Sequence, residues 1–352
     1  MSATFRIGLS AKILRGDGTL AIPEVDLSPL EGHPQIEFES LPDIGVEDLT
    51  HDMVKDLDAV VLFLERVGDH TFGPDQRLRL VARYGVGYDT VDVASCTAHD
   101  VALAIAPDGV RRPVATTVIA FLLALSLRLI EKDRIARDTP KGWNTKTDYN
   151  GLGLVGRTLG GVGIGNIGAE TFRLASPFGL NFIAHDPFVT PEAAADLGVT
   201  LVDLDTVFRE ADFVTINCPL NEGTRGLVNA ERLKLMKSTA YLINTARGPI
   251  VDETALVEAL QTGEIQGAAL DVLIDEPPKA DNPLLGMKNV ILAPHALCFT
   301  DQCMAGLGKA DIDACLAMMS GSAPSAVVNK EVLERPGFKA AIAEYAATFN
   351  QG

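Results

Sequence analysis

The sequence predicts an α/β protein built on doubly wound parallel sheets, on three observations. The chain has 352 residues, of which 47% are hydrophobic. This is more than one ordinary core needs, so we expect two domains. Short β-rich runs alternate with helix-like segments along most of the chain, as in doubly wound folds. These runs are nearly continuous in apolar residues, which is typical of strands covered on both faces.

The first hundred residues carry five expected strands. They are Phe5–Leu9, Ile36–Phe38, Ala59–Leu64, Leu78–Tyr84 and Val101–Ala106. Pro107-Asp108-Gly109 is expected to break the chain, and a long apolar helix to begin near Pro113. Its apolar run, Val114–Leu127, is shorter than the roughly 20 residues that a membrane-spanning helix needs. We therefore predict a buried helix there.

A second α/β series follows a polar, irregular stretch over residues 137–153. It begins at Thr158 and is expected to repeat strand and helix until about Pro294. A single helix is expected over Thr300–Ser320, with another helical piece after Pro336.

The run GVGIGNIG contains the spacing G-x-G-x-x-G at Gly163, Gly165 and Gly168. Its first residues end an expected strand, Thr158–Val162. The run opens a helix expected over Ala169–Phe178, and the expected strand Asn181–His185 follows. Asp186 then stands where the dinucleotide fingerprint has its ribose-binding acid. We infer a Rossmann-type site for NAD rather than NADP, because a carboxylate repels a 2′-phosphate. The alternative is a structural glycine turn followed by an exposed acid, and the flanking order of elements disfavours it.

Composition excludes several classes of function. The formal net charge of −17 makes nucleic acid an unsuitable partner. Five cysteines without C-x-x-C spacing predict neither a disulfide framework nor a zinc site, and we expect no metal. The first residues lack the pattern of a signal peptide, so we expect a cytoplasmic protein without a membrane segment.

Polar side chains follow three later expected strands. Arg247 follows an apolar strand, Asp271 and Glu276 follow the next, and His295 follows a third. Histidine titrates near neutrality and transfers protons, and arginine grips carboxylates in two places. Together they predict an acid–base site with an anion clamp. Singly, each has a structural alternative: a helix cap for Arg247, a solvated loop acid for Glu276, and a satisfied strand-end histidine for His295.

Several longer runs resemble the D-isomer-specific 2-hydroxyacid dehydrogenase family, which includes phosphoglycerate and glycerate dehydrogenases. They are RYGVGYDTVD, GVGIGNIG, CPLNEGTRGLVNAERLKLMK, NTARGPIVDE, AALDVLIDEPP, NPLLGMKNVILAPH and SGSAPSAVVN. The resemblance implies an NAD-dependent oxidoreductase that interconverts a D-2-hydroxy acid and its 2-oxo acid.

The resemblance also implies residue roles. His295 is the acid/base, Glu276 its partner, and Arg247 binds the substrate carboxylate with the backbone amides of Val86 and Gly87. Asp271 is expected to meet the nicotinamide carboxamide. The remaining cofactor-binding residues are expected to be Gly163, Gly165, Asn166, Ile167, Gly168, Asp186, Cys218, Pro219, Thr224, Thr245 and Ala246.

The resemblance further implies a Rossmann NAD-binding domain, residues 112–299, inserted into a flavodoxin-like substrate domain formed by residues 1–111 and 300–352. A homodimer is expected. Two alternatives remain: an enzyme like formate dehydrogenase, favoured by INCPL but not by Glu276, and an NADH-sensing corepressor.

Three kinds of residue depart from the family pattern or lack a role in it. Arg111 and Arg112 stand where small or polar residues are usual, and we expect surface or interdomain salt bridges there rather than ligand contacts. Cys298 is expected to be a packed thiol rather than a reactive one. Trp143 is expected to anchor a domain or subunit contact.

Overall fold

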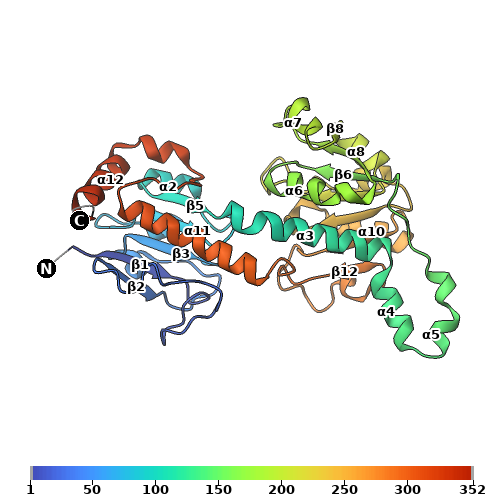
Figure 1. Ribbon diagram of the computed structural model, residues 1–352, viewed down its shortest axis with the longest axis horizontal. Helices are drawn as coiled ribbons and strands as arrows, with labels where there is room; N and C mark the ends of the chain where they lie inside the picture. The colour runs from blue at the N-terminus through green and yellow to red at the C-terminus, as the bar shows by residue number, and fades with distance from the viewer. Residues whose placement is uncertain (1–2, 350–352) are drawn as a thin grey trace. The chain divides into compact units, whose positions relative to one another are not determined.

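The computed structural model describes residues 3–349 and divides the chain into two compact units. Unit 1 is Met1–Val110 with Thr300–Gly352, and unit 2 is Arg111–Phe299. Each unit has its own parallel sheet flanked by helices (Figure 1). The predicted fold class is thereby confirmed.

Unit 1 contains a five-stranded parallel sheet in the order β2-β1-β3-β4-β5. Its strands are β1 (Phe5–Leu9), β2 (Ile36–Ser40), β3 (Ala59–Leu62), β4 (Leu80–Arg83) and β5 (Ala102–Ile105). Its helices are α1 (His51–Val54), η1 (Asp69–Thr71), α2 (Val93–Ala98), α11 (Asp301–Met319), η6 (Lys330–Glu334) and α12 (Pro336–Phe349). In Figure 1, α11 (orange) crosses the face of this sheet, and it contacts β4 and β5. This is the flavodoxin-like order.

Unit 2 contains a seven-stranded parallel sheet in the order β12-β11-β10-β9-β6-β7-β8. Its strands are β6 (Thr158–Val162), β7 (Asn181–His185), β8 (Val199–Leu201), β9 (Phe213–Ile216), β10 (Tyr241–Asn244), β11 (Gly267–Leu270) and β12 (Val290–Leu292). The chain leaves β6 toward β7 and β8, then returns to the other side of β6 with β9. Loops that follow strands at such a reversal are where open α/β sheets bind ligands.

The helices of unit 2 cover both faces of its sheet, apart from an excursion formed by α4 and α5 (Figure 1). They are α4 (Leu129–Arg137), α5 (Lys141–Asn144), η2 (Lys146–Tyr149), α6 (Asn166–Ala175), η3 (Ser176–Phe178), α7 (Pro191–Ala195), α8 (Leu204–Glu210), α9 (Ala230–Leu235), η4 (Gly248–Ile250), α10 (Glu253–Thr262) and η5 (Pro283–Gly286). Helix α3 (Pro107–Ser126) begins in unit 1 and continues into unit 2.

The prediction of a chain break at residues 107–109 is wrong, because α3 already begins at Pro107. Proline suits the first helical position, where its missing N–H is not needed. Gly109 is needed for packing: a Cβ there would lie 2.8 Å from the backbone nitrogen of Leu307 on α11. Helix α3 continues through Pro113, which has no N–H. The Gly109 carbonyl therefore lacks the helical hydrogen bond that residue 113 would otherwise donate.

Among residues 3–349, α3 is the one helix whose length and composition alone would suffice to cross a membrane. A core helix of a globular protein passes the same test. Val118, Phe121, Leu122 and Leu125 of α3 are buried in one of the cores of unit 2, as predicted for a buried helix.

Three other expectations are corrected. The strand expected to reach Leu64 ends at Leu62, because the backbone N–H groups of Phe63 and Leu64 donate to the Glu65 carboxylate at 2.8 and 3.0 Å. The helix expected over 169–178 begins three residues earlier and becomes a 3₁₀ turn at Ser176, where Pro177 follows. The stretch 137–153 is not wholly irregular, since it contains α5 and η2.

Other expectations are confirmed. β1, β6 and β7 have the predicted bounds. The expected helix near residues 300–320 is α11, with Thr300 as its N-cap, and the helical piece after Pro336 is α12.

Candidate active site

The glycine loop lies between β6 and α6, at the reversal of strand order in unit 2. Gly163 has φ +92°, which disfavours other residues. A Cβ on Gly168 would lie 2.4 Å from the carbonyl oxygen of Gly163. A Cβ on Gly165, in contrast, would meet no atom within 4 Å, so the loop is tight against the protein and open on one side.

The N-terminus of α6 fits a dinucleotide phosphate. Gly165 is the N-cap and supplies no side-chain acceptor to the first N–H groups of the helix. Such N–H groups, with the helix dipole, attract anions. Asn166 and Ile167 form the first turn, where a pyrophosphate would lie. The structure therefore brings together the loop residues that the sequence singles out.

Asp186 follows β7 and is tied to the glycine loop. Its Oδ2 accepts a hydrogen bond from the Ile164 N–H at 2.8 Å, and its Oδ1 accepts one from the Phe188 N–H at 2.9 Å. A carboxylate has about four acceptor positions, so two remain for ribose hydroxyls.

Asn217 is a site residue that the sequence analysis missed. It directly follows β9, and its backbone lies against Gly163, where a Cβ would be 3.1 Å from the Asn217 carbonyl carbon. Its Nδ2 is buried and has no hydrogen-bond partner among the described residues. A buried unsatisfied donor beside an open glycine loop fits a polar ligand such as a dinucleotide. The sequence feature that could have identified Asn217 is its position directly after a buried strand.

The next loop carries three of the expected cofactor-binding residues. Burial raises the pKa of the Cys218 thiol to about 11, so the thiol is protonated at neutral pH. The Thr224 hydroxyl donates to the Pro219 carbonyl at 2.6 Å and accepts from the Asn221 N–H at 2.8 Å. Thr224 therefore closes the turn that begins at Pro219.

The loop after β10 holds Thr245, Ala246 and Arg247 in a shape set by the buried Asn244. The Oδ1 of Asn244 accepts from the Ala246 N–H at 3.0 Å, and its Nδ2 donates to the Arg247 carbonyl at 2.9 Å. The Arg247 guanidinium donates to the Ala246 carbonyl at 2.7 Å.

His295 and Glu276 form the central pair of the site. The Nδ1 of His295 lies 2.7 Å from the Oε2 of Glu276, and both side chains are partly exposed. Burial raises the pKa of the Glu276 carboxyl, but the hydrogen bond and charge of His295 lower it. The Leu273 N–H and the Arg247 charge add to that lowering, so that the pKa stays below its ordinary value. Glu276 is ionised at neutral pH.

His295 has a left-handed backbone, with φ +55°, which is uncommon for a residue with a side chain. Asp271 holds this loop. Its carbonyl accepts from the His295 N–H at 2.7 Å, and its Oδ1 accepts from the N–H groups of Ala296 and Leu297 at 3.1 and 3.3 Å. Strained residues of this kind cluster at functional sites. Asp271 therefore orients the histidine.

The structure brings Arg247, Asp271, Glu276 and His295 together at the carboxyl edge of the unit 2 sheet, after the neighbouring strands β10, β11 and β12. Val86 and Gly87 belong to unit 1, where they follow β4 at the carboxyl edge of that sheet.

Two residues outside the site have observed contacts. Arg112 donates to Glu170 on α6 at 2.6 Å and is largely exposed, as expected for a surface salt bridge. Trp143 is 57% exposed, and its ring N–H donates to the Ala136 carbonyl at 3.1 Å.

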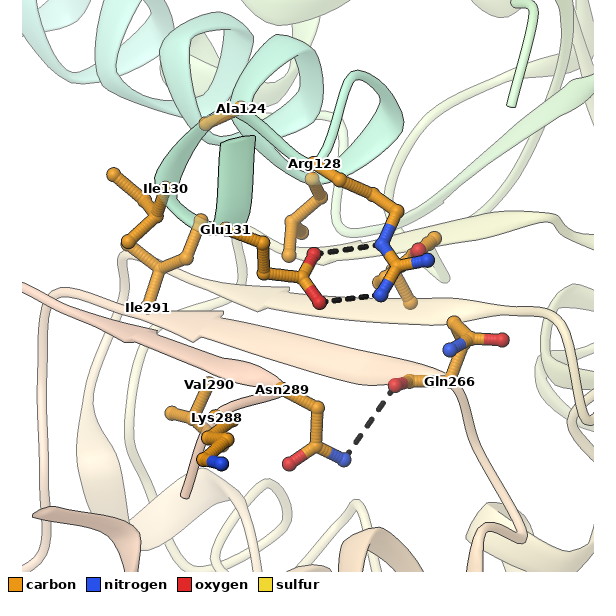
Figure 2. A pocket seen from close by; sticks show the side chains of 11 residues that line it. Ala124, Arg128, Ile130, Glu131, Gln266, Lys288, Asn289, Val290 and Ile291 are labelled. Atoms are coloured by element: carbon orange, nitrogen blue, oxygen red, sulfur yellow. Dashed lines mark hydrogen bonds and ion pairs between the residues drawn. The ribbon is translucent and has the colours of Figure 1, made fainter. Parts of the chain in front are cut away.

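A small cavity of about 30 Å³ lies at the opposite, amino edge of the unit 2 sheet (Figure 2). Arg128 and Glu131 face each other across two hydrogen bonds on its wall, close to Ile130 and Ile291. This volume holds about one water molecule. It is far too small for a dinucleotide, and it lies away from the carboxyl edge, where open α/β sheets bind ligands.

Comparison with known proteins accounts for this arrangement. Residues 119–296 match the sequence model of the D-isomer specific 2-hydroxyacid dehydrogenase, NAD binding domain. The chain is 38% identical to a glyoxylate reductase from Thermococcus onnurineus and 36% identical to one from Korarchaeum cryptofilum, each over 91% of this chain and 98% of the relative.

The chain belongs to the D-isomer specific 2-hydroxyacid dehydrogenase family. A solved family member from Lactobacillus delbrueckii, in its NAD-complexed form, superposes with a TM-score of 0.72 at 25% identity. The match covers 92% of this chain and 99% of that one. The protein is thus an NAD-dependent oxidoreductase that interconverts a D-2-hydroxy acid and its 2-oxo acid. Neither the formate dehydrogenase nor the corepressor alternative is favoured.

Proposed function

We propose that this enzyme reduces glyoxylate and other small 2-oxo acids with NADH. The observation that carries the proposal is the His295–Glu276 pair, 2.7 Å apart, beside Arg247 at the carboxyl edge of the unit 2 sheet. The names of the relatives, glyoxylate reductases, support the choice of substrate.

In the proposed reaction, bound NADH supplies the hydride that reduces C2 of the 2-oxo acid. His295 donates a proton from Nε2 to the carbonyl oxygen, since Nδ1 faces Glu276. Glu276, ionised, fixes the ring and stabilises its charged form. Arg247 binds the substrate carboxylate, with the amides of Val86 and Gly87, and its charge also favours the developing alkoxide.

The cofactor contacts are assigned from the loops described above. The pyrophosphate is proposed to lie at Asn166 and Ile167, over Gly163, Gly165 and Gly168, with the ribose at Asp186. Cys218, Pro219, Thr224, Thr245 and Ala246 complete this site. Because Oδ1 of Asp271 already accepts two backbone N–H groups, we assign its Oδ2 to the nicotinamide carboxamide.

Unit 2 is proposed to be the NAD-binding domain and unit 1 the substrate domain. We also propose a homodimer. Supporting this, the excursion that begins near α4 exposes large apolar side chains, a feature of protein interfaces. These are Leu127, Leu129, Ile130 and Trp143. A cytoplasmic location is supported by five cysteines that are all free thiols, and the net charge of −17 argues against nucleic acid as a partner.

The test is NADH oxidation with a panel of glyoxylate, hydroxypyruvate, pyruvate, phenylpyruvate, oxaloacetate and phosphohydroxypyruvate, repeated with NADPH. We expect turnover with glyoxylate, and little with NADPH because Asp186 repels the 2′-phosphate. Chiral chromatography of the hydroxypyruvate product should give D-glycerate. Tight NADH binding without turnover of any acid would contradict the proposal.

A further inference from the structure

The loop that carries Glu276 lies largely on the surface of unit 2. It covers residues 272–282, between β11 and η5, and these residues contain no helix or strand. Asp275 and Pro277, on either side of Glu276, are both exposed. Apolar burial therefore does little to fix Glu276, although its Oε2 lies 2.7 Å from the Nδ1 of His295. A catalytic pair at this distance needs a loop that is held in place by other contacts.

Glu253, the first residue of α10, accepts hydrogen bonds from two distant points of this loop. Its Oε2 accepts from the Ile274 N–H at 3.2 Å, and its Oε1 accepts from the Nδ2 of Asn282 at 2.8 Å. Asn282 is also the N-cap of η5, where its Oδ1 accepts from the Leu284 N–H at 2.9 Å. One carboxylate of α10 thus joins the beginning of the loop to its end.

The peptide group between Leu273 and Ile274 connects Glu253 to Glu276. Its N–H is the one that donates to Glu253. The group also lies against Gly248 of η4, where a Cβ would be 2.5 Å from the Ile274 nitrogen. The preceding N–H, that of Leu273, donates to the Oε1 of Glu276 at 3.0 Å. Because the peptide group is planar, a bond that fixes its N–H also restricts the adjoining Leu273, which binds Glu276.

We propose that Glu253 is a positioning residue for the acid–base pair: by holding the 272–282 loop at Ile274 and Asn282, it keeps Glu276 against His295. The inference rests on the proposed function, in which His295 donates the proton and Glu276 fixes its ring. Glu253 has no assigned contact with substrate or cofactor and acts through the loop.

The experiment compares Glu253→Ala with Glu258→Ala. Glu258 is an exposed carboxylate on the same helix, so its variant is a matched control that should behave as the wild type. In Glu253→Ala we expect kcat to fall about tenfold, because the proton donor is no longer held in its productive position. The KM for the 2-oxo acid should change less than about threefold, because Asn244 holds Arg247 independently. NADH affinity, measured by energy transfer from the single tryptophan Trp143, should be unchanged.

A rescue variant tests whether the two hydrogen bonds of Glu253 carry the effect. Glu253→Gln alone places its NH₂ group against that of Asn282, so it should lose activity as Glu253→Ala does. Glu253→Gln/Asn282→Asp exchanges donor and acceptor in that bond. The glutamine oxygen still accepts from the Ile274 N–H, and an aspartate remains a good N-cap for η5. We expect kcat of this double variant to return to within about threefold of the wild type.

Two further measurements test the route through Glu276. Added to Glu276→Ala, Glu253→Ala should lower kcat by less than about a further twofold, because no carboxylate is left to position. Hydrogen exchange of the peptide that contains residues 271–282 should be faster in Glu253→Ala, since the Ile274 N–H loses its acceptor, and Glu258→Ala should match the wild type.

Wild-type kcat in a folded Glu253→Ala variant would overturn the inference, and if Glu276→Ala is impaired in the same assay, the proposed function stands. A tenfold loss that persists in the Glu276→Ala background would also overturn it, because Glu253 would then act on another group. Wild-type kcat in Glu276→Ala would refute the role of Glu276 in the proposed function and the inference with it, so the two failures are distinguishable.

Discussion

Asp271 and Asp311 are both buried carboxylates, 4% and 2% exposed, and burial raises the pKa of each. They differ in their partners. Asp271, in unit 2, accepts N–H groups from Ala296 and Leu297 on its carboxylate. Asp311, in unit 1, leaves Oδ2 without a donor among residues 3–349.

The difference shows that burial alone does not tell what a carboxylate does. At Asp271 the backbone donors offset the desolvation, and the same bonds fix the strained His295 loop, so stability and function coincide. At Asp311 no such bond from residues 3–349 offsets the desolvation, and the charge of Arg83 opposes the rise in pKa. A group kept at a cost to stability is a candidate for function.

The largest effect is expected at Asp271. Asp271→Ala leaves the N–H groups of Ala296 and Leu297 without their acceptor and frees the loop that carries His295. We expect kcat to fall about a hundredfold or more and the free energy of unfolding to fall by about 2 kcal/mol. Steady-state kinetics and urea unfolding measure the two. An Asp271→Ala variant with kcat within threefold of the wild type would contradict the role of Asp271 in holding the His295 loop, and with it the difference drawn between Asp271 and Asp311.

A smaller catalytic effect is expected at Glu276, a partly exposed carboxylate paired with the His295 ring. Glu276→Gln should lower kcat/KM about ten- to a hundredfold with little change in stability. Because the pKa of Glu276 is below its ordinary value of 4.5, the wild type should lose activity from this group only as pH falls below that value. The acid limb of the kcat/KM profile should be absent in the variant. An identical limb in both proteins would contradict this role of Glu276.

Asp311 gives a test through stability, because burial raises the pKa of its carboxyl and the positive charge of Arg83 opposes that rise. Arg83→Met removes this favourable charge, so the free energy of unfolding should fall by about 1 kcal/mol at neutral pH. A carboxyl group whose pKa is raised in the folded state favours folding at low pH, and this contribution is lost as pH rises through the raised value. The deficit should therefore shrink toward low pH.

Adding Asp311→Leu to Arg83→Met should restore most of the lost stability, because both charges are then gone. The other groups that act on this region are Tyr84, Cys303, Cys315 and Glu24. Burial raises the pKa of the Tyr84 hydroxyl and of the Cys315 thiol, so both remain protonated in the acidic range. Cys303 and Glu24 are present in all the proteins compared. Urea unfolding of the wild type and of the single and double variants, from pH 4 to pH 8, measures these changes. A deficit independent of pH would show that Asp311 is not its source.

The smallest effect is expected at Arg112, which is largely exposed and forms an ion pair with the mostly buried Glu170. Arg112→Ala should change the free energy of unfolding by less than about 0.5 kcal/mol, since Glu170 also pairs with Arg173. Urea unfolding suffices as the measurement. A loss well above that value would mean that exposed pairs matter here as much as buried ones.

Much of this was predictable from sequence. Short β-like runs predicted the bounds of β1, β6 and β7, and the glycine spacing with Asp186 indicated the cofactor loop. The residue types at strand ends indicated His295 and Glu276, because parallel strands bring their carboxyl ends to one edge.

The features that were predicted wrongly or not at all depend on contacts between residues that are far apart in the sequence. The helix start at Pro107 depends on the close approach of Gly109 to α11. The φ of His295 and the clamp by Asp271 depend on bonds across 24 or more residues. Asp311 looks like an ordinary polar position of a helix, and only the packing of α11 shows that it is buried.

The proposed mechanism depends most directly on His295 as the proton donor. The decisive measurement is kcat for glyoxylate reduction by His295→Gln, made on samples whose NADH affinity is measured by energy transfer from Trp143. We predict a fall in kcat of about a thousandfold or more, with NADH affinity within twofold of wild type. A variant that binds NADH normally and retains kcat within tenfold would contradict the central claim.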